Sequence, residues 1–385
     1  MLVCGEPSGD LLGAQLMAGL RSISPDVEIT GIGGPAMTAE GLESLFSLDA
    51  TAVMGLREVV PAIPAILRRV RQASDFALKT RPNAVVLIDS PDFTHRIAQR
   101  LKRSDPSIRT INYVAPQVWA SRAYRARKMA RYFDLVLALL PFEAPFFERY
   151  GLKTVFVGHP AVERAARMTG GTSLRARLGI AADAPLLGVF PGSRSNEIRF
   201  ILPAFREAVA QTARQVAGLV SILPTMPHVA ARVRATTADW PTPLHIVESE
   251  ADKFAAFDAI DAALAASGTV TMELALARKP MVVGYRAGWL TYFLALPLMT
   301  VKYIALINIL LDREAVPEFL QSRCTASNLS KALVPLITNK EAAARERVDL
   351  DAATALLGRG GEAPSLRAAR AILDFVSAQR LESGT

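Results

Sequence analysis

The chain has 385 residues, of which 51% are hydrophobic and 21% charged, with a mean hydropathy of +0.24. This composition excludes a disordered protein, a collagen and a disulfide-stabilised miniprotein, and the length corresponds to about two or three domains. The formal net charge of +8 and the pI near 9.7 favour an anionic partner: nucleic acid, membrane headgroups or a phosphorylated substrate. The two cysteines, Cys4 and Cys324, are far apart and predict neither a disulfide nor a metal or redox site.

The N-terminus carries neither the basic nor the apolar region of a secretory signal, so the sequence predicts a cytoplasmic protein. The longest apolar tract, residues 287–311, is interrupted by Pro297 and Lys302. Its uninterrupted parts are shorter than the roughly 18 residues needed to span a bilayer. We therefore expect buried or interfacial helices there.

Strand-like apolar runs alternate with helical stretches along the chain, which predicts parallel sheets with crossover helices. The runs are continuously apolar, as expected for strands covered by helices on both faces, so the predicted class is doubly wound α/β. They lie at residues 2–4, 84–88, 110–114, 135–138, 186–190, 219–223, 244–247, 262–265 and 281–284.

A polar, glycine-containing stretch at 160–172 separates these runs into two groups and predicts a hinge. The simplest architecture is two Rossmann-like domains facing each other across a cleft, with ligands at the carboxyl ends of the strands. We expect domains at residues 1–165 and 166–345, followed by a helical segment at 346–385.

The first loop, residues 5–13, is a glycine-rich turn between a strand and a helix, in the position of a phosphate-binding loop. Glu6 and Asp10 would repel the pyrophosphate of a dinucleotide, so this loop favours a hydroxyl-rich ligand. The alternative is a structural turn in which Ser8 or Asp10 caps the helix.

The loop after the first strand of the second half has the opposite character. Gly192 and Ser193 lead into a helix whose N-terminal amides suit an anion, and Arg194 supplies a guanidinium for phosphate. The diphosphate of a ligand is therefore expected in this half. The alternative is an ordinary turn with a solvated arginine.

A second loop of this kind contains Ser267, Gly268 and Thr269, with Glu273 one helical turn later. The hydroxyls suit phosphate oxygens and Glu273 suits ribose hydroxyls, although a capping carboxylate is an equally good interpretation. Two anion-binding loops on one sheet favour a nucleoside diphosphate over a single phosphate.

Asp89 and Asp92 follow a buried strand of the first half, where α/β enzymes keep catalytic groups. Asp89 could remove a proton from an acceptor hydroxyl, and Asp92 could orient Asp89 or cap the next helix. The structural alternative is a carboxylate bonded to neighbouring loop amides. The four histidines form no catalytic triad or metal-ligand pattern, and no metal or cofactor is expected.

Two stretches suit a membrane surface. Residues 53–70 are apolar and end at a cluster of arginines. Residues 122–131 form a basic run that could bind headgroups, nucleic acid or a substrate phosphate. An ordinary amphipathic core helix explains the first stretch equally well. Nucleic acid is disfavoured because no nucleic-acid-binding module is present.

Several separate stretches match, in order, the motifs of one known family. They are residues 5–10 (GEPSGD), 53–55 (VMG), 88–93 (IDSPDF), 113–120 (YVAPQVWA), 140–143 (LPFE), 157–160 (VGHP), 191–194 (PGSR), 267–269 with Glu273, and 280–286 (PMVVGYR). On these residues the chain resembles the lipid-A-disaccharide synthase family, inverting glycosyltransferases of lipopolysaccharide synthesis in Gram-negative bacteria.

The resemblance implies a GT-B fold with the acceptor held by the N-terminal domain and the UDP donor by the C-terminal domain. It implies transfer of 2,3-diacylglucosamine from UDP to the 6-hydroxyl of 2,3-diacylglucosamine 1-phosphate, giving a β-linked disaccharide, with no metal. It also implies peripheral attachment to the inner face of the cytoplasmic membrane, and it is compatible with a homodimer.

The resemblance also implies roles for individual residues. Asp89 would be the base, and Glu6 and Ser8 would contact the acceptor. UDP would be bound by Gly192, Ser193, Arg194, Ser267, Gly268, Thr269, Glu273 and Asn308, although Ile307 replaces a proline that usually precedes Asn308 in the family.

Other functions remain open at this stage. The nearest is another GT-B enzyme acting on UDP-N-acetylglucosamine, either a transferase or a 2-epimerase, which would not require acyl chains. A non-catalytic, membrane-bound nucleotide-sugar binder would tolerate loss of Asp89. An NAD oxidoreductase is disfavoured by Glu6 in the first loop.

Overall fold

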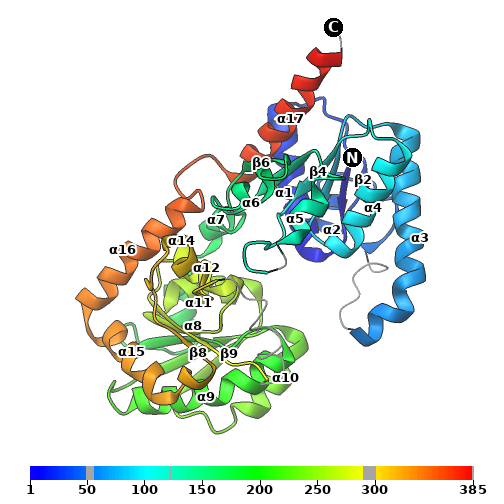
Figure 1. The fold of residues 1–385 in the computed structure, drawn as a ribbon. Coiled ribbons are helices and arrows are strands. Elements are labelled where there is room, and N and C mark those ends of the chain that lie inside the picture. Colours follow the sequence, from blue (N-terminus) through cyan, green and yellow to red (C-terminus); the bar gives the residue numbers. More distant parts are fainter. Residues whose placement is uncertain (49–55, 122, 289–300, 384–385) are drawn as a thin grey trace. The chain divides into compact units, whose positions relative to one another are not determined.

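The computed structural model describes residues 1–48, 56–121, 123–288 and 301–383 (Figure 1). The chain forms two compact units. Unit 1 comprises Met1–Pro160 and Gly360–Thr385, and unit 2 comprises Ala161–Arg359. The chain therefore leaves unit 1, builds unit 2, and returns to unit 1 for its last helix.

Unit 1 is built on a six-stranded sheet in the order β2-β1-β3-β4-β5-β6, in which every pair of neighbours is parallel. Its strands are β1 (Leu2–Cys4), β2 (Gly31–Ile32), β3 (Val85–Ile88), β4 (Thr110–Tyr113), β5 (Leu135–Ala138) and β6 (Lys153–Phe156). Its helices are α1 (Pro7–Ile23), α2 (Pro35–Ala39), α3 (Leu56–Thr80), α4 (Pro91–Ser104), α5 (Tyr124–Met129), α6 (Ala144–Glu148) and α17 (Pro364–Ser383). The central strands β1, β3, β4 and β5 are buried along their whole length, as the apolar runs predict.

Unit 2 contains a second parallel sheet in the order β12-β11-β10-β7-β8-β9. Its strands are β7 (Leu186–Phe190), β8 (Val220–Pro224), β9 (Leu244–Val247), β10 (Ala262–Ala265), β11 (Met281–Tyr285) and β12 (Glu318–Leu320). Its α-helices are α7 (Ala161–Arg164), α8 (Gly171–Arg177), α9 (Ser195–Ala213), α10 (Pro227–Thr236), α11 (Glu250–Ala259), α12 (Thr269–Leu276), α14 (Leu306–Leu311), α15 (Ala326–Thr338) and α16 (Lys340–Leu356). The two faces of this sheet bury separate apolar clusters.

The C-terminal helix α17 packs against α1 of unit 1. Gly19 of α1 makes this approach possible, because a Cβ at this position would lie 2.9 Å from the carbonyl oxygen of Ser365. Ala369 lies on the same contact, where small residues allow the two helices to come close.

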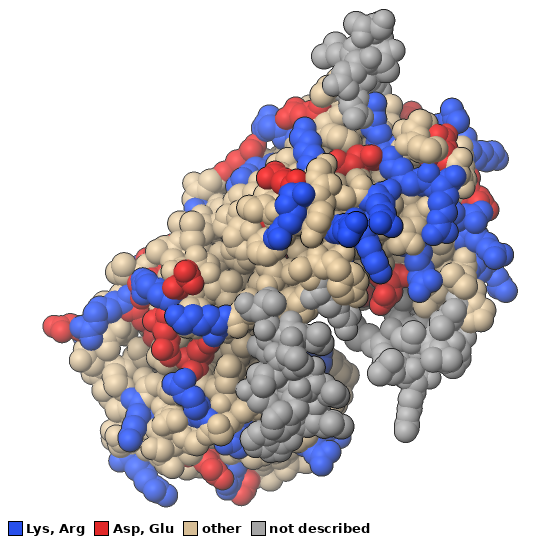
Figure 2. Space-filling view, viewed as in Figure 1, with Lys and Arg blue, Asp and Glu red and all other residues tan. Residues whose placement is uncertain are grey.

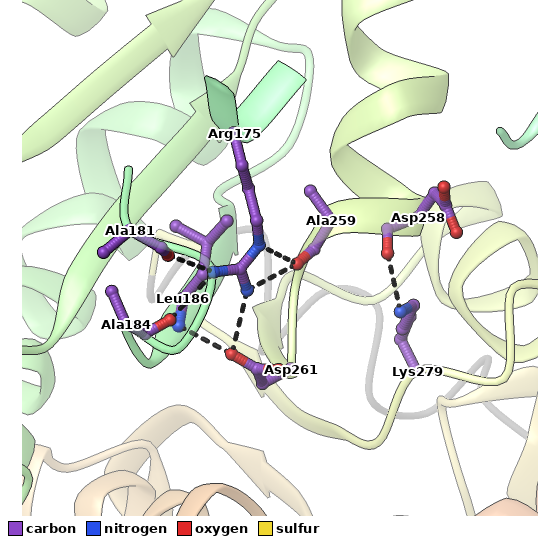
Figure 3. Close-up of polar contacts among 8 residues, drawn as sticks. All are labelled: Arg175, Ala181, Ala184, Leu186, Asp258, Ala259, Asp261 and Lys279. Carbon is purple, nitrogen blue, oxygen red and sulfur yellow. Dashed lines mark hydrogen bonds and ion pairs between the residues drawn. The ribbon is translucent and has the colours of Figure 1, made fainter. Parts of the chain in front are cut away.

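The largely buried side chain of Arg175 stabilises the amino ends of two unit 2 strands, β7 and β10 (Figure 3). Arg175 of α8 donates to the carbonyl oxygen of Ala259 from Nε and Nη2, at 3.0 and 2.7 Å, and forms an ion pair with Asp261 at 3.1 Å. Asp261 in turn accepts from the amide of Leu186, the first residue of β7, at 2.8 Å. Helix α8 is thus tied to the start of β7 and β10 by one side chain.

In each unit the strand order reverses at one point, and this is where open α/β sheets bind ligands. In unit 1 the point lies between β1 and β3, whose last residues, Cys4 and Ile88, are paired. In unit 2 it lies between β7 and β10, whose last residues, Phe190 and Ala265, are also paired. The loops that follow these four strands are the ones that sequence analysis singles out.

The predicted α/β class is confirmed, and each of the nine predicted strands is present to within one residue at either end. The sequence did not reveal β2, β6 and β12. All three are edge strands: β2 and β6 are the two edges of the unit 1 sheet, and β12 is an edge of the unit 2 sheet. Strands β2 and β12 are also short, with two and three residues. Edge strands of this kind carry little of the continuous apolar signal.

Two predictions fall partly outside the described residues. Of the apolar stretch 53–70, residues 53–55 lie outside them, whereas the part from Leu56 onward belongs to α3. Of the tract 287–311, residues 289–300 lie outside them, and its end forms α14. None of the helices in the described part of the chain is long and apolar enough to cross a membrane.

Candidate active site

Unit 1 brings Ser8 and Asp89 together at its strand reversal. The Ser8 hydroxyl donates to Oδ2 of Asp89 at 3.4 Å. The loops meet closely here, since a Cβ on Gly5 would lie 2.6 Å from the Ser90 hydroxyl. Glu6 is the N-cap of α1 and is half-buried beside them. The three predicted acceptor-side residues thus belong to two adjoining loops at one sheet edge.

Asp89 is held in an unusual backbone conformation. Both Asp89 and Ser90 have left-handed φ values, 52° and 46°. Their backbone is fixed by bonds from the Asp89 amide to Tyr113, at 3.0 Å, and from the Thr94 hydroxyl to the Asp89 carbonyl, at 2.6 Å. Strained residues in a well-bonded frame are typical of functional sites, because the surrounding structure must hold them in place.

Asp10 has a different role from the one expected. It is 4% exposed, and its carboxylate accepts from the amides of Gly34, Ala36 and Met37 at 2.7 to 3.0 Å. The expectation that Asp10 faces a ligand in the first loop is therefore wrong: it caps α2 instead. Of the two carboxylates in the loop, only Glu6 remains as an argument against a dinucleotide.

In unit 2 the loop after β7 is organised by Glu197, a residue that sequence analysis did not assign to the site. Its Oε2 accepts from the amides of Ser193 and Arg194 at 3.0 and 3.2 Å, and its Oε1 pairs with the Arg194 guanidinium at 3.0 Å. Gly192 has φ 104°, and a Cβ there would lie 2.3 Å from Glu197 Oε2, so only glycine fits.

This arrangement determines which groups of the loop are free to bind an anion. The Ser193 and Arg194 amides, expected to face phosphate, are occupied by the Glu197 carboxylate. The Arg194 side chain is 81% exposed, and a guanidinium has five donors, of which one is used on Glu197. The Arg194 guanidinium is thus the accessible positive group of the loop. The capping-box spacing, with a glutamate three residues after the N-cap, was the signal for Glu197.

The loop after β10 carries the second group of predicted residues. Gly268 and Thr269 are exposed at the start of α12, and a Cβ on Gly268 would meet nothing within 4 Å. The Ser267 hydroxyl donates to the carbonyl oxygen of Ile304 at 2.8 Å, so it joins this loop to the segment before α14.

Glu273 is almost completely buried and lies between two cations. Its side chain is 4% exposed, with Oε2 at 2.7 Å from Lys253 Nζ and Oε1 at 3.9 Å from Arg164 Nη2. Neither cation was among the residues predicted from the sequence. The charge of Glu273 is balanced within unit 2 by Lys253, which lies on α11, and by Arg164, which lies on α7.

Asn308 is fully buried and uses both ends of its side-chain amide on the protein. Its Nδ2 donates to Val316 and Glu318 at 2.9 and 3.2 Å, and its Oδ1 accepts from the amides of Ala315 and Val316 at 2.8 and 2.9 Å. In this structure Asn308 shapes the turn after α14. Its predicted contact with the nucleotide stays a prediction.

The profile of the lipid-A-disaccharide synthetase family matches residues 1–370. The chain is 46% identical to the lipid-A-disaccharide synthase of Rhodospirillum centenum, over 98% of this chain and 94% of the relative. It is 45% identical to that of Paramagnetospirillum magneticum, over 97% of both chains. The chain belongs to the lipid-A-disaccharide synthase family. It is accordingly a glycosyltransferase, as the resemblance of its motifs predicts.

Solved structures with similar folds support the architecture. A putative UDP-N-acetylglucosamine 2-epimerase from Listeria monocytogenes has a TM-score of 0.67 at 14% identity, covering 99% of this chain and 96% of the other. MurG of Acinetobacter baumannii has a TM-score of 0.53 at 15% identity, covering 93% and 98%. At these identities the comparison concerns the fold alone, and it confirms the GT-B class predicted for this family member.

Proposed function

We propose that this enzyme transfers 2,3-diacylglucosamine from UDP to the 6-hydroxyl of 2,3-diacylglucosamine 1-phosphate, with inversion at the anomeric carbon. The observation that carries the proposal is its 46% identity to a lipid-A-disaccharide synthase over 98% of the chain. Unit 1 would hold the acceptor and unit 2 the UDP donor, in line with the domain roles expected from the sequence.

On the acceptor side, Asp89 acts as the general base. Its carboxylate takes the proton of the 6-hydroxyl as that oxygen forms a bond to the anomeric carbon. Ser8 donates to one carboxylate oxygen, Oδ2, and leaves Oδ1 to face the acceptor. Glu6, half-buried on the same edge, binds acceptor hydroxyls. The proton on Asp89 passes to water after the product leaves.

On the donor side, the bond from the anomeric carbon to the diphosphate breaks and UDP leaves with the electron pair. The exposed Arg194 guanidinium stabilises the charge that develops on the diphosphate. The open backbone at Gly268 and Thr269, at the start of α12, supplies amides to the same group. Glu273 accepts from the ribose hydroxyls, and Ser267 and Asn308 fix the neighbouring turn.

The test is disaccharide formation in detergent micelles from the two acylated substrates, with Asp89→Asn as the variant and non-acylated UDP-N-acetylglucosamine as the control donor. We expect turnover with the acylated pair only, and a kcat lower by about 10²- to 10⁴-fold in Asp89→Asn. If Asp89→Asn retains the wild-type kcat, another residue is the base. A folded protein that binds UDP but makes no disaccharide would contradict the proposed function in favour of a related enzyme or a binder.

We also propose that unit 1 binds the inner face of the cytoplasmic membrane peripherally, since both substrates carry acyl chains. Lys and Arg gather on the visible face of unit 1, over the region of α3, α4 and α5 (Figure 2). On α5, Arg127 and Lys128 are exposed beside Tyr124, which is 55% exposed. On α3, Leu67 is 39% exposed beside Arg68. Apolar and cationic side chains together suit an anionic lipid surface.

Co-sedimentation with vesicles tests the membrane proposal. We expect binding to vesicles that contain anionic phospholipid, weakened by salt, and reduced by the double variant Arg127→Glu, Lys128→Glu. The pair Arg206→Glu, Arg214→Glu on α9 of unit 2 and its end is the charge-matched control. Equal binding to neutral and anionic vesicles, or equal loss in both variants, would contradict a site on unit 1.

A further inference from the structure

The loop after β4, residues 114–121, lies at the same sheet edge as Asp89. Strand β4 neighbours β3, and the Asp89 amide donates to Tyr113, the last residue of β4, at 3.0 Å. The loop therefore begins beside the proposed base. Its Gln117 is exposed, whereas Val118 and Trp119 are buried. The polar side chain of Gln117 is thus exposed at this edge, and the buried side chains of Val118 and Trp119 hold the loop in place.

The start of this loop is strained. Val114 has φ 81°, a left-handed value that is costly for a β-branched residue. It is held there by a bond from its amide to Leu137 of β5, at 3.3 Å, and by one from the Asn112 side chain to its carbonyl, at 2.9 Å. With Asp89 and Ser90, this makes three left-handed non-glycine residues at the ends of two adjacent strands.

The far side of the loop is fastened by Glu143, which follows β5. Glu143 is 2% exposed. Its Oε1 accepts from the indole Nε1 of Trp119 at 3.1 Å, and its Oε2 accepts from the amides of Leu139 and Leu140 at 3.1 and 3.0 Å. The Trp119 ring also packs edge-on against Phe142, with the ring centres 5.2 Å apart.

All three of these partners are N–H donors, and a carboxylate accepts only, so the ionised form satisfies every one of them. Burial raises the pKa of Glu143 to about 7, and its hydrogen bonds from Leu140, Trp119 and Leu139 act in the opposite direction. The bonds to Leu139 and Leu140 stay within the turn after β5. Of these three bonds, the one to Trp119 connects the turn to the loop after β4. The turn after β5 does not require this bond for its own conformation.

We propose that Glu143 is a positioning residue for the glycosyl transfer: through Trp119 it holds the 114–121 loop beside Asp89, where the loop forms one wall of the acceptor site. This inference rests on the proposed function, because it takes Asp89 as the base and unit 1 as the acceptor side. It adds two residues, Glu143 and Trp119, which act on the acceptor through the loop.

The test measures KM separately for acceptor and donor in three variants. Trp119→Phe removes the indole N–H and keeps an aromatic ring. Glu143→Gln leaves one acceptor oxygen, whereas Glu143 accepts with both of its carboxylate oxygens. Glu346→Gln is the matched control: it makes the same substitution at another buried glutamate, 6% exposed, whose side chain accepts from the Met281 amide in unit 2.

We expect both unit 1 variants to raise the acceptor KM by about tenfold, as for the loss of a hydrogen bond to a charged group, and to leave the donor KM within about twofold. Glu346→Gln should change neither. Equal changes in both KM values, or no change, in Trp119→Phe would overturn the inference, even if Glu143→Gln does not fold. A wild-type enzyme that makes no disaccharide would instead overturn the proposed function, and the acceptor assignment with it.

Discussion

The Ser8 hydroxyl donates a hydrogen bond to Asp89, 81 residues further along the chain, across the strand reversal of unit 1. The bond joins the first glycine-rich loop to the end of β3. In the proposed mechanism, the second oxygen of the carboxylate accepts from a hydroxyl of the acceptor. We therefore expect Ser8 to orient Asp89 in its proposed role as the base, and a substitution of Ser8 tests this.

Ser8→Ala should lower kcat by about five- to tenfold, with little change in stability. The bond is long, at 3.4 Å, and Ser8 is exposed, so its loss leaves no buried group unsatisfied. Ser22→Ala on the same helix, which removes a bond from Ser22 to the Gly19 carbonyl, is the control and should leave kcat unchanged. An unchanged kcat in Ser8→Ala would show that Asp89 does not depend on this contact.

Lys253→Met should raise the donor KM by about tenfold and leave the acceptor KM unchanged. The substitution removes the closest cation from Glu273, at 2.7 Å, and leaves Arg164 at 3.9 Å as its charged partner. A buried carboxylate that loses its nearest cation is destabilised. We therefore expect the Glu273 side chain to shift from its position in the donor site.

Lys279→Met is the control for Lys253→Met. Lys279 Nζ donates to the Asp258 carbonyl at 2.9 Å, near the amino ends of the unit 2 strands and away from the loops (Figure 3). We expect its donor KM to match that of the wild type. If the two lysine variants have the same donor KM, Glu273 does not bind the donor in the proposed way. Titration of each variant with UDP provides the corresponding affinities.

Arg175→Met should lower the free energy of unfolding of unit 2 by about 2–3 kcal/mol, because it removes the hydrogen bonds to the Ala184 and Ala259 carbonyls together with the ion pair to Asp261. For a unit of this size the thermal midpoint should fall by about 5–10 °C. Arg206→Met, which removes an exposed pair with Asp239, should cost less than about 1 kcal/mol. Calorimetry measures the thermal midpoints of both variants. Equal midpoints for Arg175→Met and Arg206→Met would contradict a structural role for Arg175.

Glu346→Gln should make stability less dependent on pH. Burial raises the pKa of Glu346 from 4.5 to about 8, so the folded state keeps a proton that the unfolded state loses. The stability that this proton contributes is present below about pH 4.5 and is lost as the pH rises through about 8. A neutral glutamine oxygen can still accept from the Met281 amide, whose bond to Glu346 is 2.6 Å long.

The variant should therefore match the wild type at about pH 5 and exceed its free energy of unfolding by about 2–4 kcal/mol at about pH 9. Urea unfolding at the two pH values measures this difference. Glu341→Gln, in the exposed first turn of the same helix, is the control and should show no such gain at high pH. A gain of the same size at both pH values would exclude ionisation of Glu346 as its cause.

The α/β class could be predicted from the sequence because the signals for its strands and loops each lie within a few consecutive residues. Buried parallel strands such as β3 and β10 are continuous apolar runs, and glycine-rich turns mark the loops that follow them. Since parallel strands end at a common edge, the loops with Ser8, Asp89, Arg194 and Ser267 could be placed at the right edges without coordinates. The short edge strand β2 was missed because two residues, Gly31–Ile32, carry no periodicity.

Only the tertiary structure decided which side chains these residues meet. Asp10 caps α2, Glu197 occupies the Ser193 and Arg194 amides, and Asn308 is saturated by Val316 and its neighbours. The partners of Glu273 and Glu143, which are Lys253 and Trp119, lie on other elements. Such contacts depend on how helices and loops pack on a sheet, and hydrophobic periodicity and residue spacing report the position of an element but not the direction of each polar side chain on it.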